Sequence, residues 1–110
     1  MRRFLLPAVA AAAVFAAGCG GSATSGPVAA TEVEMVKSYR FDPKVIEIEA
    51  GNTVTWTNDD NFTHTVQVEG QEDHEVEQGE SVEITFDEPG TYEYVCTLHS
   101  NDMRGTVIAK

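Results

Sequence analysis

Four side chains whose types suit a metal ion stand in or near one short segment close to the C-terminus. Cys96, His99 and Met103 follow one another with the spacing Cys-x2-His-x3-Met, and His64 precedes Cys96 by 32 residues. Together they offer one thiolate, two imidazoles and one thioether. A trigonal plane of two His and one Cys, with a long and weak axial Met, is the ligand set of a blue-copper electron-transfer site. The sequence therefore predicts one type 1 copper ion held by these four residues.

The donor types explain why copper is favoured over zinc. Thiolate and thioether suit Cu(I), imidazole suits both oxidation states, and a weakly capped trigonal plane changes little on reduction. Structural zinc usually takes four Cys or His ligands in paired spacing, whereas this chain has only two Cys. His74 could join a site only if the acidic segment around it folded back, and we expect it not to be a ligand. Any one of these residues alone would more often be a packing residue, so the prediction depends on their joint spacing.

The first residues are typical of an export signal. Arg2 and Arg3 precede an apolar, alanine-rich run that ends at Ala17. A basic start, a short apolar run and small residues at its end describe a secretory signal peptide. The run is shorter than a transmembrane helix requires. We expect residues 1–18 to be removed from an exported protein.

Cys19 follows this run and resembles the lipidated Cys of a bacterial lipobox. The lipobox usually has Leu three residues before the Cys, where this chain has Ala16. We expect a lipid anchor on Cys19, with residues 19–31 forming the modified Cys and a flexible tether of small and polar residues. An ordinary signal peptide with an unmodified Cys19 is the alternative. A Cys19–Cys96 disulfide is a second alternative, although it would consume the best metal ligand.

The charge of the chain limits its partners. The formal net charge is −11, and loss of residues 1–18 with Arg2 and Arg3 brings it to −13. Such a chain is not expected to bind nucleic acid, whose phosphates need Lys and Arg. The charge favours either steering toward a basic partner or simple solubility, including tolerance of salt. The acidic stretch 69–80 has the same two readings: a solvated loop or edge strand, which we favour slightly, or a docking face.

Residues 32–110 carry the pattern of an all-β domain. Apolar residues alternate with polar ones, which predicts strands with one buried face. The alternation is clearest at Val54 and Trp56, at Val66 and Val68, and at Val82, Ile84 and Phe86. Further strands are expected at 33–36, 45–48, 91–95 and 106–108. Turn-forming residues separate them at 42–43, 50–52, 58–61, 78–79 and 88–90. About eight short strands in about 80 residues suggest a Greek-key β-sandwich.

Three segments resemble the cupredoxin family, in particular plastocyanin- and amicyanin-like domains. They are 54–66, 89–99 and 103–107, and the similarity extends over nearly all of residues 32–110. The resemblance implies an eight-stranded Greek-key sandwich with copper at one end and one-electron transfer as the activity. His64, Cys96, His99 and Met103 fall on the four ligand positions of the family.

The chain departs from the cupredoxin pattern at residues beside the predicted ligands. Leu98 stands where the family often has Pro, and Thr65 stands where plastocyanins have Asn. The three residues between His99 and Met103 make a loop between the amicyanin-like and plastocyanin-like lengths. Thr65 and Thr97 could supply hydrogen bonds near the thiolate.

These observations predict a monomeric, membrane-anchored blue-copper carrier outside the cytoplasmic membrane, at the cell surface or in the periplasm. It would pass single electrons between a donor and an acceptor protein with a basic docking face. Electrons would leave through the edge of His99, near the apolar Leu98 and Phe62. No nucleophile–base pair is visible, so we expect no enzyme activity of its own. The alternatives are a copper carrier or scavenger without electron-transfer duty, and a metal-free module that binds a partner.

Overall fold

The computed structural model describes residues 26–110, and the predicted signal peptide and Cys19 lie outside the described residues. The described part contains ten strands and one 3-10 helix. Their bounds are β1 Val28–Ala29, β2 Glu32–Val36, β3 Arg40–Asp42, β4 Val45–Ile48, β5 Thr53–Asn58, β6 His64–Val68, β7 Asp73–Val76, β8 Ser81–Thr85, β9 Gly90–Val95, η1 Thr97–His99 and β10 Arg104–Ala109. No helix in residues 26–110 is long and apolar enough to span a membrane.

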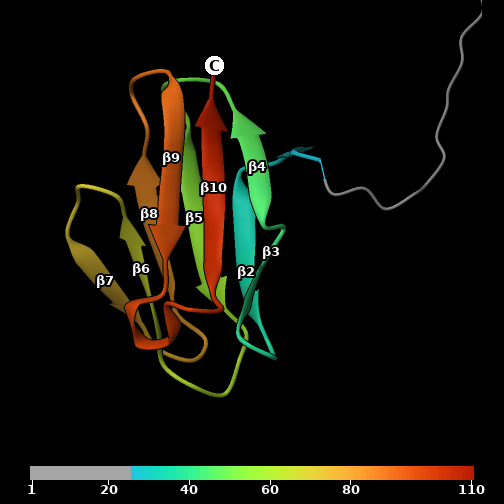
Figure 1. Ribbon diagram of the computed structural model, residues 1–110, viewed down its shortest axis with the longest axis vertical. Helices are drawn as coiled ribbons and strands as arrows, with labels where there is room; N and C mark the ends of the chain where they lie inside the picture. Colours follow the sequence, from blue (N-terminus) through green and yellow to red (C-terminus); the bar gives the residue numbers. More distant parts are fainter. Residues whose placement is uncertain (1–25) are drawn as a thin grey trace, which may run out of the picture.

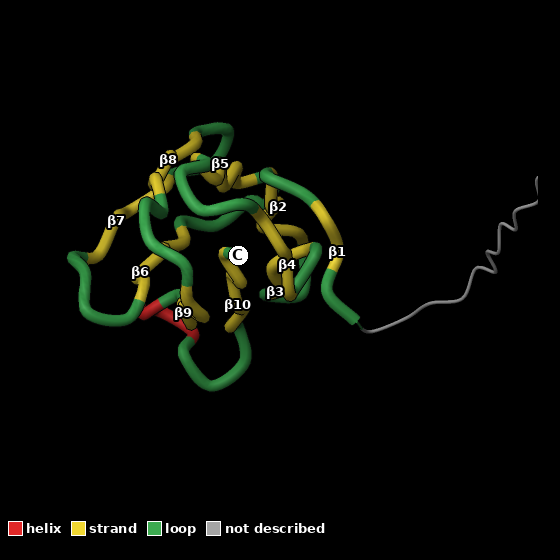
Figure 2. The backbone as a smooth tube through the Cα atoms, turned by 90° about the horizontal axis from the view of Figure 1, so that it is seen from above, coloured by secondary structure: helices red, strands yellow, loops and turns green. Residues whose placement is uncertain are grey.

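The strands form two sheets that pack face to face. One sheet has six strands in the order β1-β4-β10-β9-β6-β7, and the other has four in the order β3-β2-β5-β8. Most neighbouring strands are antiparallel, whereas β4 pairs in parallel with both β1 and β10, and β2 pairs in parallel with β5. Figure 1 shows the sandwich from the side, and Figure 2 shows its two layers from above. The predicted all-β sandwich is confirmed.

The core is built from the alternating residues that the sequence marked. In β5, Val54 and Trp56 are fully buried while Thr53, Thr55 and Thr57 are more accessible. The Trp56 ring meets the ring of Tyr94 edge to face across the two sheets, with centroids 5.1 Å apart. Such an arrangement suits the charge distribution of aromatic rings and adds to the apolar area that they bury.

Two short strands and one edge strand go beyond the predicted set. Val28 and Ala29, which the sequence assigns to the tether, form β1 beside β4, so the sheet begins ahead of the predicted boundary at residue 32. The short β3 follows a tight turn after β2. β7 lies within the acidic stretch 69–80 and forms one edge of the six-stranded sheet, which agrees with the edge-strand reading of that stretch. Strands of two or three residues lack enough alternation to be seen in sequence.

The segments that carry the predicted ligands meet at one end of the sandwich. The loop after β9 with η1 and the start of β6 lie at the end opposite the C-terminus, together with the β2–β3 turn (Figure 1). Loops at the end of a rigid sandwich can place side chains close together although they are distant in sequence.

Candidate metal centre

The loop between β9 and β10 brings three of the predicted ligands together. Cys96 directly follows β9, His99 ends η1, and Met103 directly precedes β10. The Cys96 N–H donates to the Met103 carbonyl at 3.0 Å, the His99 N–H donates to the Cys96 carbonyl at 3.0 Å, and the Met103 N–H donates to the His99 carbonyl at 2.9 Å. Since each of the three residues is bonded through its backbone to another, the loop fixes their relative positions.

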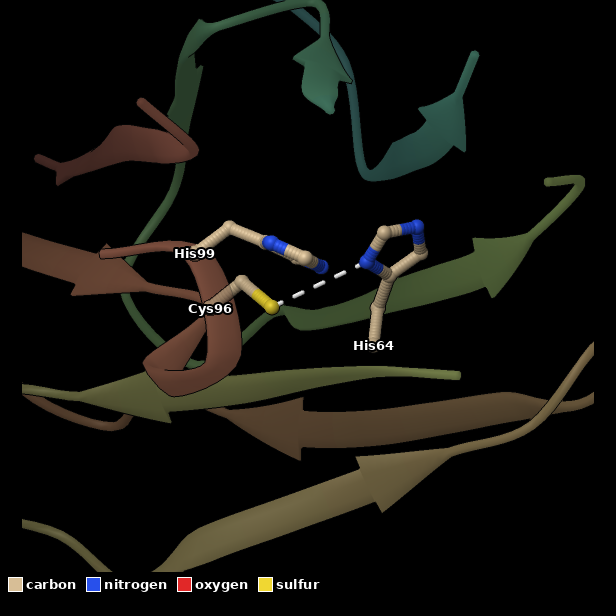
Figure 3. A group of neighbouring side chains, drawn as sticks. All are labelled: His64, Cys96 and His99. Carbon is tan, nitrogen blue, oxygen red and sulfur yellow. Dashed lines mark hydrogen bonds between the residues drawn. The ribbon is translucent and has the colours of Figure 1, made fainter. Parts of the chain in front are cut away.

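His64 approaches this loop from the first position of β6. Its Nδ1 lies 3.7 Å from Sγ of Cys96, and a ligand atom from each of His64, Cys96 and His99 lies within 4.8 Å of the others. Figure 3 shows the two imidazole rings and the thiol pointing toward one common point. His64 and Cys96 are fully buried and His99 is half-buried.

This arrangement leaves room for one metal ion between the donor atoms. Bond lengths of about 2.3 Å to sulfur and 2.0 Å to nitrogen let one ion bridge a sulfur and a nitrogen that lie up to about 4.3 Å apart. The observed separation between Cys96 Sγ and His64 Nδ1 is 3.7 Å. Met103 is fully buried, and its backbone is hydrogen-bonded to both Cys96 and His99. His74 lies in β7 and is outside this group of ligand atoms among the described residues. A thiolate, two imidazoles and a thioether are the donor set of a type 1 copper ion.

Thr65 and Thr97 connect the Cys96 thiol by hydrogen bonds to Asp73, in the acidic edge strand β7. The backbone N–H of Thr65 donates to Sγ of Cys96 at 3.3 Å, and the Thr97 N–H donates to Oγ1 of Thr65 at 2.7 Å. The two threonine hydroxyls lie 2.8 Å apart, and Oγ1 of Thr97 donates to Oδ2 of Asp73 at 2.8 Å. The predicted hydrogen bonds near the thiolate are thus present, but the direct one comes from backbone and not from a hydroxyl. An N–H aimed at sulfur stabilises its negative charge.

Asp60, which the sequence pattern did not single out, lies against His64. Its Oδ2 accepts a hydrogen bond from Nε2 of His64 at 2.9 Å, on the far side of the ring from Cys96. Because a carboxylate only accepts, the ring hydrogen lies on Nε2 and leaves Nδ1 free for a metal. This hydrogen bond lowers the pKa of the Asp60 carboxyl, against the opposing effect of burial.

Exposed apolar side chains lie near His99 in space or in sequence. The Tyr39 ring, from the turn between β2 and β3, stacks on the His99 ring with centroids 4.3 Å apart, and it neighbours the ring of Phe62 at 6.1 Å. Phe62 and Leu98 are 56% and 55% exposed. We call Tyr39, Phe62 and Leu98 the apolar patch. Phe62 and Leu98 were predicted here, whereas Tyr39 was not.

Comparison with known proteins places this geometry in a family. Residues 8–109 match the family described as cupredoxin-like domain. The chain is 33% identical to amicyanin-alpha of Methylorubrum extorquens, over 96% of this chain and 92% of that protein. Among solved structures it is similar to a novel purple cupredoxin from Nitrosopumilus maritimus, with a TM-score of 0.67 and 26% identity over 74% of this chain and all of the other.

A third similarity is to part of an enzyme. The chain matches a copper-containing nitrite reductase from Thermus scotoductus with a TM-score of 0.62 and 34% identity, over 76% of this chain but only 22% of the reductase. The similarity to amicyanin-alpha instead spans nearly the whole of both proteins. The two-sheet sandwich, the His64–Cys96–His99 cluster and these matches agree, and the chain belongs to the cupredoxin family of type 1 copper proteins.

Proposed function

We propose that this protein is a blue-copper electron carrier, with His64, Cys96 and His99 as the in-plane ligands and Met103 as the axial ligand. The observation that carries this proposal is the convergence of one thiol and two imidazoles from two segments distant in sequence, within 4.8 Å of one another. Copper, when bound, supplies one-electron chemistry between Cu(II) and Cu(I).

The protein holds the ligands so that they need not move. Backbone hydrogen bonds fix Cys96, His99 and Met103 relative to one another, and the Thr65 N–H donates to the Cys96 sulfur. Ligands that keep their positions in both oxidation states leave little reorganisation for each electron. The buried positions of His64 and Cys96 exclude water from the plane.

Electrons would enter and leave through His99. Among the three clustered ligands it is the one that is not fully buried, and Tyr39 of the apolar patch stacks on its ring. A small exposed apolar surface is typical of a site where another protein docks. We propose that the donor and acceptor proteins dock on Tyr39, Phe62 and Leu98 and thereby approach the ring of His99.

Charge would bring these partners to the patch. The acidic residues of the 69–80 stretch are exposed along and beside the edge strand β7; they are Glu69, Glu72, Asp73, Glu75, Glu77 and Glu80. Complementary charge raises association rates, so we propose partners with a basic docking face. We propose that the carrier itself is a monomer.

The absence of an enzyme activity of its own is part of this proposal. The match to the nitrite reductase covers 22% of that chain, so it is confined to a part of the enzyme. The match to amicyanin-alpha covers 92% of that protein. A chain that resembles a small cupredoxin over its whole length is better suited to carry electrons than to turn over a substrate.

A visible spectrum tests the copper assignment. The purified domain loaded with Cu(II) should be intensely coloured, because a short bond from the Cys96 thiolate gives a strong charge-transfer band. Zinc-loaded protein serves as the colourless control. A colourless protein that retains zinc after exposure to copper would contradict the proposal.

Voltammetry separates an electron carrier from a copper scavenger. A carrier should show fast and reversible one-electron reduction with copper retained in both states. A scavenger should instead release copper after reduction. A Cu(I) chelator added to the electrochemical cell would detect the released ion. Coloured protein with irreversible voltammetry would favour the scavenger.

We also propose that the exported chain is held at the membrane by a lipid on Cys19. The support is the sequence of residues 1–19, which lie outside the described residues. The mature protein should fractionate with membranes, and Cys19→Ser should release it or block its processing. Mass spectrometry that finds a mature N-terminus beyond Cys19, without lipid, would refute the anchor.

A further inference from the structure

A buried carboxylate lies behind one copper ligand. Asp60, in the loop between β5 and β6, is 2% exposed, and its Oδ2 lies 2.9 Å from Nε2 of the fully buried His64. We infer that Asp60 is a positioning residue that aims Nδ1 of His64 at the metal and, through its negative charge, lowers the reduction potential of the site. This inference rests on the proposed copper function.

The loop leaves the Asp60 carboxylate little freedom to move. Its second oxygen, Oδ1, accepts the Asn61 N–H at 2.7 Å. Asn58 fixes the backbone around it, because Oδ1 of Asn58 accepts the Asp60 N–H at 2.8 Å. The Asn58 side-chain amide also donates to the carbonyls of Phe62 and Val76 at 2.8 and 2.9 Å. Both carboxylate oxygens and the backbone N–H of Asp60 are therefore engaged, and the carboxylate stays aligned with the His64 ring.

A carbonyl could orient the ring as well, but a carboxylate adds a full negative charge. Charges that are removed from water interact more strongly than exposed ones. Metal-binding His residues transmit such contacts, because a carboxylate on the second ring nitrogen raises the basicity of the first. A more basic Nδ1 and a nearby anion both favour Cu(II) over Cu(I).

The charge balance of the site gives the direction of the effect. With Cu(II), the Cys96 thiolate and the Asp60 carboxylate, the net charge is zero. Reduction adds one electron from the donor protein, forms no new bond, moves no proton and leaves the site at minus one. An unbalanced buried charge is costly. Without the carboxylate, reduction would take the net charge of the site from plus one to zero, so reduction would be easier.

The test compares Asp60→Asn with Asp59→Asn in the copper-loaded protein. Both remove one negative charge from the same loop, but Asp59 is exposed. For Asp60→Asn, the equilibrium constant for reduction by a fixed mediator should rise at least about tenfold, which is about 59 mV for a one-electron couple. For Asp59→Asn the change should be less than about twofold, since water and salt screen an exposed charge. Equal shifts in the two variants, or a lower potential in Asp60→Asn, would overturn the charge role.

A second measurement examines ring positioning without copper. In the copper-free wild-type protein, nitrogen-15 NMR at neutral pH should find the His64 hydrogen on Nε2. Asp60→Ala should give a mixture of the two tautomers, with circular dichroism confirming that the variant is folded. A wild-type ring protonated on Nδ1 alone would overturn the positioning role, even if Asp60→Asn were unfolded. Loss of copper colour in the wild type would instead count against the proposed function, so the two failures are distinguishable.

Discussion

The ring of Tyr39 stacks on the ring of His99, with centroids 4.3 Å apart and planes inclined by 33°. Tyr39 and its neighbour Ser38 have positive φ values of 57° and 75°, which non-glycine residues seldom adopt. Two consecutive positive φ values are typical of a tight hairpin turn. The turn between β2 and β3 thus directs an aromatic side chain onto His99, the partly accessible member of the His64–Cys96–His99 cluster.

Removal of this ring should loosen His99. Aromatic pairs contribute about 0.5–1.5 kcal/mol beyond the area they bury, so Tyr39→Ala should speed copper release to a chelator by up to about tenfold. Tyr39→Phe is the matched control and should behave as the wild type, because it keeps the ring. Stopped-flow loss of the visible band measures the rate. Equal rates for all three proteins would show that the stack does not hold the ligand.

Substitutions at Cys96 and Met103 should have different effects. Cys96→Ser should abolish the intense colour and the redox activity, because the thiolate provides both the main bond and the charge-transfer band. Met103→Leu should keep copper and raise the reduction potential, because the weak thioether tunes the metal and does not hold it. Spectra and voltammetry measure both variants. If Met103→Leu lost copper as completely as Cys96→Ser, the axial assignment would be wrong.

Replacement of Gly105 by any larger residue should destabilise the fold. It lies opposite Tyr94 in the β9–β10 pairing, and a Cβ there would approach the Tyr94 ring within 2.4 Å and the Lys44 carbonyl within 2.7 Å. Overpacking of a filled core typically costs about 1–3 kcal/mol, so Gly105→Ala should lower the free energy of unfolding by about 3 kcal/mol in urea titrations. Gly90→Ala, where the nearest atoms lie at an ordinary 3.5 Å, is the control and should change it little.

Electron exchange with the partner should slow as salt rises. Exposed charges are screened within about 10 Å at 0.1 M ionic strength, and steering acts mainly on association. The bimolecular rate should therefore fall while electron transfer within the complex changes little. Stopped-flow mixing over a range of salt concentrations measures both.

Paired substitutions locate the steering charge. Glu75→Gln with Glu77→Gln, at the acidic edge, should weaken the salt dependence. The same change at the exposed Glu49 and Glu88, on loops at the opposite end of the sandwich, should have a smaller effect (Figure 1). A rate that is flat or rises with salt would mean that the acidity serves solubility or salt tolerance, with docking left to the apolar patch alone.

The ligand set was accessible from sequence because its members have distinctive chemistry. Cys96, His99 and Met103 lie within eight residues, and the distant His64 joins them as a predicted ligand because its type completes the set. The strands of the sandwich were equally visible, because alternating burial leaves an alternating sequence, as in β5.

Asp60 and Tyr39 were not accessible for a different reason. Asp59 and Asp60 are chemically identical in a turn-forming run, yet one is exposed and the other is buried against His64. Nothing in sequence distinguishes them, because the choice depends on how the Asn58 side chain folds the loop. Tyr39 contacts His99 across 60 residues of chain, so only the packing of the two sheets brings them together.

The site is fastened to both layers of the sandwich. Tyr39 extends from the four-stranded sheet, whereas His64 begins a strand of the six-stranded sheet and Cys96 follows another. A slip of one layer over the other would shear the Tyr39–His99 stack and leave the hydrogen-bonded loop of Cys96 and Met103 intact. Copper release would then report on layer alignment, because the loss of the stack frees the His99 ring while Cys96 and its visible band stay in place. Pressure, heat or a remote core substitution that misaligns the layers should speed copper release to a chelator before the colour changes.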